Sequence, residues 1–269
     1  MVIGVLRDDL DRLKGMTVLL AEDNVTNQLV ATQMLENLGA SVDVAADGAI
    51  ALNLLAERSY DLLLVDIEMP RVSGLDVIRA VRASGGALAE APVIALTAYA
   101  MQEHREKIAQ AGADGLIPKP IISIEQFGSD ILTYMDDGAS KRVSAVPARS
   151  TNMNATIEES IFDSLANTLG PDAMENLLGK VEIDLRSVRD QITEAMSSGD
   201  TELMRSGTHV LISVSGAIGG VRLQGQAEKL NGLAHQGDYI EMKELAEETL
   251  KELDGVIGFV ENKISGNAI

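Results

Sequence analysis

Several apolar runs in the first half of the chain end at residues whose side chains could handle a phosphoryl group. Glu22 and Asp23 follow the first run, Asp66 and Thr97 end the next two, and Lys119 follows the last. Apolar runs of this kind are typical of buried parallel strands, whose carboxyl ends lie at one edge of a sheet. We therefore expect three carboxylates, a hydroxyl and an ammonium group to meet at that edge.

This set of groups suits the transfer of a phosphoryl group onto a carboxylate. Three clustered carboxylates repel one another, and a hard cation with oxygen ligands, such as Mg²⁺, relieves the repulsion. Asp66 would act as the nucleophile, Lys119 would balance the added charge, and Thr97 would donate a hydrogen bond to a phosphoryl oxygen. Any one of these residues alone could merely cap a strand or helix, but all of them in this order favour phosphoryl transfer.

The elements that must position these residues alternate between strand and helix from Thr17 onward, which predicts βαβ units and a parallel sheet. The predicted strands are Thr17–Ala21, Ser41–Ala45, Leu62–Val65, Val93–Leu96 and Gly115–Ile117, and the predicted helices are Asn27–Leu38, Ala49–Glu57, Gly74–Ala83, Met101–Ala111 and Ser123–Tyr134.

The second half has the apolar period of helices and predicts an all-α antiparallel bundle. Its predicted helices are Ile157–Leu169, Pro171–Ser197, Asp200–Gly216, Gly220–Ala234 and Ile240–Ile264. Small and polar residues between the halves indicate a flexible linker. The predicted organisation is an amphipathic helical lead-in at 1–15 rather than a dimerisation seam, the α/β domain at 16–135, the linker at 136–156, the bundle at 157–264 and a tail at 265–269.

The net charge, the cysteine count and the lengths of the apolar runs exclude several classes of partner and site. The 269 residues carry a net charge of −19, which argues against nucleic acid and anionic lipid surfaces. There is no cysteine, which excludes disulfides and cysteine-based metal or redox sites. No apolar run approaches the roughly 20 residues that span a bilayer, so we expect a cytoplasmic protein with no membrane span in this chain.

A second candidate site lies on the predicted helix that contains His209. Ser213 and Gly216, one and two turns further on, are small and would leave the imidazole approachable from one side. A neutral imidazole can attack an aspartyl phosphate and hold the group as a phosphoramidate. An isolated histidine more often has no such role, so the pattern alone leaves both interpretations open.

Residues 17–135 resemble the receiver domain of two-component response regulators, in particular the receivers attached to hybrid histidine kinases. The resemblance implies a flavodoxin-like, doubly wound parallel sheet of five strands in the order 2-1-3-4-5. It rests on Glu22-Asp23-Asn24 with Asn27-Gln28, on Asp66-Ile67-Glu68-Met69-Pro70 with Gly74, on Ala95-Leu96-Thr97-Ala98 and on Lys119-Pro120.

The same resemblance implies roles for these residues. Asp66 would accept a phosphoryl group from a histidine kinase or another phosphohistidine donor. A downstream receiver or phosphotransfer domain would be the next partner, and a receiver dimer stays open. The resemblance further implies that Mg²⁺ is held by Glu22, Asp23, Asp66 and the backbone carbonyl of Glu68, that Thr97 and Lys119 contact the phosphoryl group, and that Tyr99 is the aromatic switch residue.

Residues 157–264 resemble a histidine phosphotransfer (HPt) domain, whose motif is His-x-Leu-Lys-Gly followed by a further Gly. His209, Leu211 and Gly219 match this motif, whereas Ile212 stands where a lysine is usual and Ser213 where a glycine is usual. The resemblance implies that the bundle exchanges phosphate through His209. Losing the lysine removes a cation that would balance the phosphoryl charge, and a lysine restored at 212 would then speed transfer.

The leading interpretation is a phosphorelay protein, and two others stay open. The bundle could be a binding module that transfers nothing, for which Ile212 is the best support. The chain could instead be a haloacid-dehalogenase-like phosphatase, which also uses a strand-end aspartate with Mg²⁺, Thr and Lys. Such enzymes usually need a second aspartate two residues on, where this chain has Glu68, and the pair of Glu22 and Asp23 would then be unexplained. The sequence does not decide whether the protein stands alone or belongs to a hybrid kinase.

Overall fold

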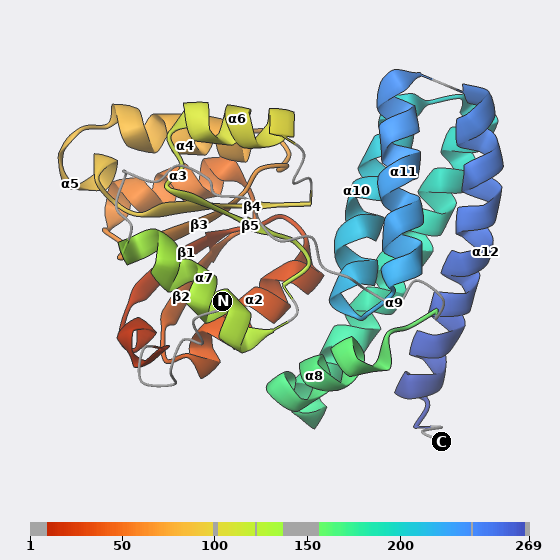
Figure 1. The fold of residues 1–269 in the computed structure, drawn as a ribbon, viewed down its shortest axis with the longest axis horizontal. Coiled ribbons are helices and arrows are strands. Elements are labelled where there is room, and N and C mark those ends of the chain that lie inside the picture. The colour runs from red at the N-terminus through yellow and green to blue at the C-terminus, as the bar shows by residue number, and fades with distance from the viewer. Residues whose placement is uncertain (1–9, 99–101, 122, 137–155, 238, 267–269) are drawn as a thin grey trace. The chain divides into compact units, whose positions relative to one another are not determined.

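The computed structural model describes residues 10–98, 102–121, 123–136, 156–237 and 239–266 (Figure 1). The chain divides into two compact units, Met1–Pro147 and Ala148–Ile269. The division falls inside the segment 136–156, where the apolar periodicity of the sequence stops.

The first unit is a parallel sheet of five strands in the order β2-β1-β3-β4-β5, as predicted. Helices α2 and α7 cover one face of the sheet, and α3, α4 and α6 cover the other (Figure 1). The strands are β1 Thr17–Ala21, β2 Ser41–Ala45, β3 Leu62–Asp66, β4 Val93–Thr97 and β5 Gly115–Pro118; the helices are α2 Val25–Asn37, α3 Gly48–Glu57, α4 Gly74–Ala83, α5 Gly86–Ala89, α6 Gln102–Ala111 and α7 Ile124–Asp136.

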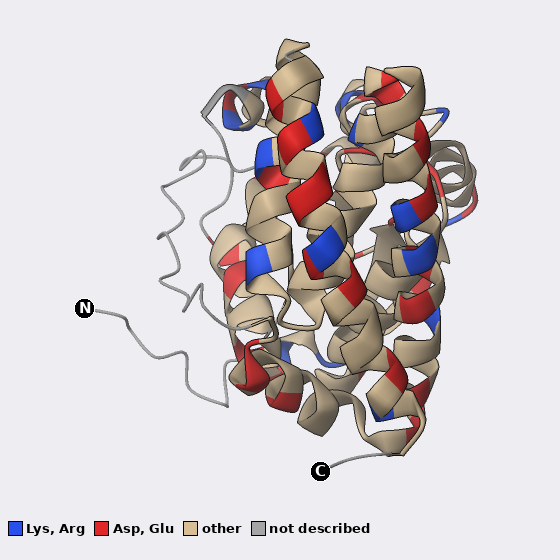
Figure 2. Ribbon diagram, turned by 90° about the vertical axis from the view of Figure 1, so that its right-hand side faces the viewer, with Lys and Arg blue, Asp and Glu red and all other residues tan. Residues whose placement is uncertain are grey.

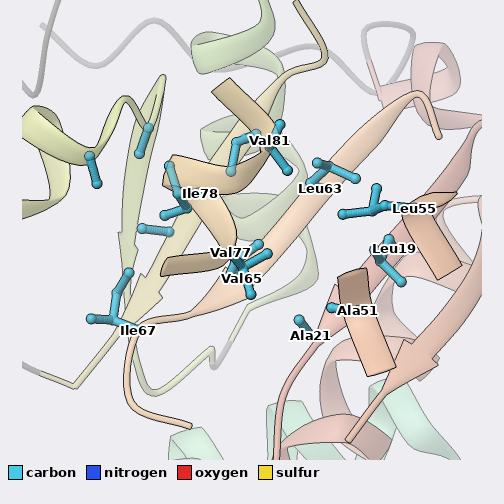
Figure 3. Close-up of a cluster of buried hydrophobic side chains, with 14 of the residues drawn as sticks. Leu19, Ala21, Ala51, Leu55, Leu63, Val65, Ile67, Val77, Ile78 and Val81 are labelled. Carbon is cyan, nitrogen blue, oxygen red and sulfur yellow. The ribbon is translucent and has the colours of Figure 1, made fainter. Parts of the chain in front are cut away.

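The core of this unit lies on both faces of the central strands. Every residue of β3 and β4 is buried, which explains why these strands are nearly continuous apolar runs in the sequence. Side chains of β1 and β3 meet those of α3 and α4 (Figure 3). The cluster on this face includes Leu19, Leu63, Val65, Leu55, Val77, Ile78 and Val81.

The predicted lead-in helix is described only from residue 10, where Leu10 is helical, and the rest of the prediction lies outside the described residues. Asp11–Leu13 form a short 3₁₀ turn. Leu13 is buried, and Leu10 lies so close to α7 that a Cβ on Gly128 would be 2.6 Å from its Cδ2. The guanidinium of Arg12 donates to both carboxylate oxygens of Asp136, at 2.7 and 2.5 Å. Leu10 and Leu13 therefore pack on their own domain.

The second unit is an all-α bundle, as predicted. Gly199 adopts a left-handed conformation at the end of α9, and the carboxylate of Asp200 accepts hydrogen bonds from two backbone N–H groups of the next helix. Glu158 N donates to the carbonyl of Gly219 at 2.7 Å, which joins the start of α8 to the turn after α10. The helices are α8 Glu159–Leu169, α9 Pro171–Ser198, α10 Thr201–Ala217, α11 Val221–Gln236 and α12 Tyr239–Ile264.

Acidic and basic residues are interspersed along the outer faces of the bundle helices (Figure 2). Several form ion pairs between helices, such as Arg189 of α9 with Asp254 of α12, whose Nε and Oδ1 are 3.0 Å apart. No helix in the described part of the chain is long and apolar enough to cross a membrane.

Candidate functional site

Three carboxylates meet at the carboxyl edge of the sheet. Glu22 and Asp23 follow β1, Asp66 ends β3, and these strands are neighbours with Ala21 paired to Val65. One oxygen from each carboxylate lies within 4.8 Å of the others. Glu22 and Asp66 are each 1% exposed, so the repulsion between them is little screened by water. The oxygen-only donor set fits a hard divalent cation such as Mg²⁺.

Lys119 reaches the same edge from the far side of the sheet. It follows β5, and its backbone N–H donates to the carbonyl of Thr97 at the end of β4, at 2.8 Å. Its Nζ lies 2.7 Å from Asp66 Oδ2 and 2.6 Å from Glu22 Oε2. The peptide bond from Lys119 to Pro120 is cis. The predicted ammonium group is thus buried among the carboxylates that it was expected to face.

Burial and charge shift the pKa values of two of these groups. Burial, reinforced by the charge of Asp66 and opposed by that of Lys119, raises the pKa of Glu22 to about 7. Burial alone would lower the pKa of Lys119, but Asp66 and Glu22 outweigh it and hold that pKa above its ordinary value. Near neutral pH the lysine is charged, and a cation would compete with a proton for Glu22.

The polar residues after the acidic pair support Glu22. Asn24 caps α2 by accepting from Asn27 N at 2.9 Å. The side-chain amide of Asn27 donates to Glu22 Oε1 at 2.9 Å, and that of Gln28 donates to the Glu22 carbonyl at 2.6 Å. The segment Glu22–Asn24 with Asn27 and Gln28 therefore acts as one hydrogen-bonded unit that orients the carboxylate.

The loop after Asp66 returns tightly to the end of β3. Glu68 N donates to Asp66 Oδ1 at 3.2 Å, and Gly74 N donates to the carbonyl of Ile67 at 3.0 Å. A Cβ on Gly74 would lie only 1.9 Å from the carbonyl oxygen of Asp66. Position 74 must therefore be glycine for α4 to start so close to the strand. The role of the Glu68 carbonyl as a metal ligand stays a prediction.

An ion pair beside this loop was not anticipated from the sequence. Asp47 is fully buried, caps α3 by accepting from Ile50 N at 2.8 Å, and pairs with the guanidinium of Arg71. Arg71 adopts the left-handed conformation with φ 68°, in the loop between Asp66 and α4. The pair ties that loop to the loop between β2 and α3. An aspartate before a helix predicts a cap, but nothing in the sequence indicates its partner.

Three predicted site residues remain: Thr97, Tyr99 and His209. Tyr99 lies outside the described residues. Thr97 is buried at the end of β4, next to the Leu96 that pairs with Asp66 across the sheet. His209 is half-buried in α10, in the second unit.

The packing of α11 against α10 near His209 shows the surroundings of position 212, where the HPt motif has a lysine. Asn231 of α11 donates to the hydroxyl of Thr208 at 2.8 Å and to the carbonyl of Arg205 at 3.1 Å, so α11 covers this side of α10. Ile212 lies one turn beyond Thr208 on the same side and is 0% exposed. A lysine here would bring an ammonium group into the packing between two helices. The structure thus shows Ile212 as a packing residue, and the effect of a lysine on the transfer rate stays a prediction.

Three comparisons place the first unit among known proteins. The family model for the response regulator receiver domain matches residues 18–128. The polar-differentiation response regulator DivK of Brucella anthropi is 37% identical over 121 residues, which are 45% of this chain and 97% of DivK. The sensory/regulatory protein RpfC of Xanthomonas campestris pv. campestris is 28% identical over 216 residues, 77% of this chain and 29% of RpfC.

A further relative is similar over a comparable length of this chain. The aerobic respiration control sensor protein ArcB of Escherichia coli (strain K12) is 27% identical over 212 residues, 79% of this chain and 27% of ArcB. The chain thus spans less than a third of the length of RpfC and of ArcB. The family match covers the α/β unit that carries the acidic edge, and the match to DivK takes in nearly all of that protein. The chain therefore belongs to the response regulator receiver family, and residues 18–128 are a receiver domain of two-component signalling.

Proposed function

We propose that the chain is a phosphorelay protein. Its receiver accepts a phosphoryl group on Asp66 from a phosphohistidine donor, and its bundle exchanges phosphate through His209. The observation that carries the proposal is the meeting of Asp66 with two further carboxylates and the ammonium group of Lys119 at one edge of the sheet. The proposed domains are the receiver at 16–135, the linker at 136–156 and an HPt-like bundle at 157–264.

The acidic edge would hold Mg²⁺ through Glu22, Asp23, Asp66 and the backbone carbonyl of Glu68. When bound, the ion supplies positive charge that neutralises the phosphoryl oxygens and the clustered carboxylates. Two observations support this assignment: the oxygen donors lie within 4.8 Å of one another, and the pKa of Glu22 is raised. Both indicate electrostatic repulsion that a bound cation would reduce.

The chemistry proposed for this chain's residues is a nucleophilic substitution at phosphorus. A carboxylate oxygen of Asp66 forms the new P–O bond as the P–N bond to the donor imidazole breaks, and the electron pair of that bond returns to the imidazole. Lys119, 2.7 Å from Asp66, remains positively charged and balances the acyl phosphate. Thr97 donates its hydroxyl hydrogen to a phosphoryl oxygen, and Tyr99 reports the modification as the switch residue.

The similarity to RpfC extends beyond the receiver, which supports treating the two units together. The match to RpfC covers 216 residues, more than the first unit, Met1–Pro147, contains, so it includes part of the bundle. The HPt-like motif residues His209, Leu211 and Gly219 lie on α10 and the turn that follows it. The partners proposed are a histidine kinase or other phosphohistidine donor, and a downstream receiver or HPt domain.

Labelling with a small phosphodonor tests the receiver half of the proposal. Acetyl phosphate with Mg²⁺ should place one base-labile, acid-stable label on the full chain, and Asp66→Asn should abolish it. Asp61→Asn is the matched control, because Asp61 is an aspartate of the same unit that accepts hydrogen bonds from Thr17. Persistence of the acyl phosphate on Asp66→Asn would refute the assignment of Asp66.

A binding module that transfers nothing is the second candidate for the bundle. The buried, apolar Ile212 favours it, because the usual lysine is absent. A bundle that binds a phosphorylated receiver and never acquires an acid-labile label at His209 would establish this alternative. The phosphatase alternative is disfavoured, because membership of the receiver family accounts for the pair of Glu22 and Asp23.

A further inference from the structure

We propose that Arg205 supplies the positive charge that balances a phosphoryl group on His209. This inference rests on the proposed phosphotransfer through His209 and names the residue that takes over the task of the lysine missing at position 212. It draws on the placement of Arg205 along α10, on its contact with α11 and on the absence of a carboxylate partner for it in the part of the chain that the structure describes.

Arg205 precedes His209 by one helical turn. Residues four apart on a helix are neighbours, with about 5–6 Å between their Cβ atoms. Helical side chains lean toward the N-terminus, so the imidazole of His209 extends over the turn to which Arg205 belongs. A cation at 205 can therefore reach a group carried by the imidazole, whereas Ile212 is enclosed between α10 and α11.

Within the described ranges, Arg205 has no carboxylate partner. Among the residues that the structure describes, no Asp or Glu oxygen lies within ion-pair distance of it, and its Nε is buried without a hydrogen-bond partner. In a chain with net charge −19, such a guanidinium is available to an anion. By contrast, eight other described arginines each pair with an Asp or Glu: Arg12, Arg58, Arg71, Arg79, Arg82, Arg186, Arg189 and Arg222.

Contacts with α11 hold Arg205 in place. Asn231 donates to the Arg205 carbonyl at 3.1 Å, and Arg205 Nη1 lies 3.5 Å from Nδ1 of the exposed His235. Its side chain is half-buried, which limits screening by water. The guanidinium is thus positioned beside α11 before any phosphoryl group arrives, and little side-chain entropy is lost on binding.

The step that Arg205 would assist conserves atoms and electrons. The lone pair of the unprotonated imidazole nitrogen of His209 forms the P–N bond. The P–O bond to the donor aspartate breaks, and its electron pair leaves with the carboxylate. The proton on the other ring nitrogen stays, and the guanidinium of Arg205 stabilises the negative phosphoryl oxygens.

The test uses full-length chains that carry only one of the two acceptors. The donor is His209→Gln, labelled at Asp66 with acetyl phosphate. The acceptor is Asp66→Asn, alone or combined with Arg205→Gln, Arg205→Lys or Arg189→Gln. Arg189 is the matched control, because it is an arginine of the same unit that pairs with Asp254. A second arm replaces the donor with phosphoramidate, which phosphorylates imidazole directly and releases ammonia.

We expect Arg205→Gln to slow labelling of His209 about tenfold at saturating donor, as for the loss of one charge-assisted contact, with Arg205→Lys restoring most of the rate. Arg189→Gln should match the parent acceptor. Labelling of Arg205→Gln at the parent rate in either arm would overturn the inference. Absence of label on the parent acceptor in both arms would instead refute the proposed function.

Melting curves of the variants distinguish a structural role for Arg205 from a role in charge balance. If the melting temperature of Arg205→Gln is below that of the parent, the labelling rate of Arg205→Lys is used instead. This variant keeps the charge and the aliphatic stem. A folded Arg205→Lys variant with parent-like rates then supports the inference, and one that is slowed tenfold or more overturns it.

Discussion

The receiver and the bundle assemble their candidate sites by different routes. In the receiver, Glu22, Asp66 and Lys119 are far apart in the chain, meet at the ends of three strands and are all buried. In the bundle, Arg205 and His209 lie one turn apart on a single helix, and both are half-buried. The receiver site therefore depends on the order of strands in a sheet, whereas the bundle site depends on which side of α10 its neighbour α11 covers.

The two units also differ in where their oppositely charged side chains pair, in the interior or at the surface. The receiver buries opposite charges in contact, which is favourable only when hydrogen bonds and partners compensate the lost hydration. The bundle pairs most of its arginines near the surface, where each pair contributes at most about 1 kcal/mol. Removing one charge should consequently affect the receiver more than the bundle.

The largest contrast is expected from one substitution made in each unit. Gly74→Ala forces a Cβ to 1.9 Å from the Asp66 carbonyl oxygen, and the backbone must shift. We expect the receiver to lose about 2–4 kcal/mol of unfolding free energy. Gly232→Ala on α11, where a Cβ meets nothing within 4 Å, should stabilise the bundle by up to about 1 kcal/mol. Hydrogen exchange of each unit's amides measures both, and equal effects would contradict the comparison.

A buried cation should be tolerated poorly on the α11 side of α10. Ile212→Lys should lower the unfolding free energy of the bundle by about 2–3 kcal/mol, since its ammonium group would lose hydration between two helices. Ile183→Lys is the matched control, because Ile183 is 68% exposed on α9. Chemical denaturation monitored in the bundle gives both values. If Ile212→Lys instead transfers phosphate to His209 faster at unchanged stability, the motif-based prediction that a lysine at this position speeds transfer is confirmed.

The buried carboxylate should make the metal-free receiver sensitive to pH. The pKa of Glu22 is about 7 in the folded chain against 4.5 for an ordinary glutamate, so the folded state holds this proton more tightly. Stability in chelator should therefore fall by about 1–2 kcal/mol as pH rises from 4.5 to 7, and Glu22→Gln should remove that fall. Denaturation at pH 5 and pH 8 measures the difference. The bundle serves as the internal control, and a fall that persists in Glu22→Gln would assign the effect elsewhere.

The smallest effect concerns the half-buried member of the acidic cluster. Asp23→Asn should weaken Mg²⁺ binding roughly tenfold or more, because a charged ligand is lost. Metal-free stability should stay the same or rise, because the repulsion among the carboxylates falls. Titration with Mg²⁺ followed by calorimetry, beside denaturation in chelator, tests both. A marked loss of metal-free stability would instead indicate a structural role for Asp23.

Much of the receiver could be predicted from sequence because its central strands are buried on both faces. Continuous apolar runs located β1, β3 and β4, and the polar residue that ends each run identified Asp66 and Thr97. The prediction missed α5, because so short an element has too few residues for a period to be read.

The sequence by itself determined the kinds of chemical group available and the fold that gathers them, because residue type and apolar period are local properties. Only the tertiary structure decided that burial raises the pKa of Glu22, that Asp47 pairs with Arg71, and that Gly74 is required by contact with Asp66. It likewise decided that Ile212 is enclosed by α11 while the guanidinium of Arg205 lies beside His235. These properties depend on which residues of other elements come within a few ångströms, and that proximity exists only once the chain has folded.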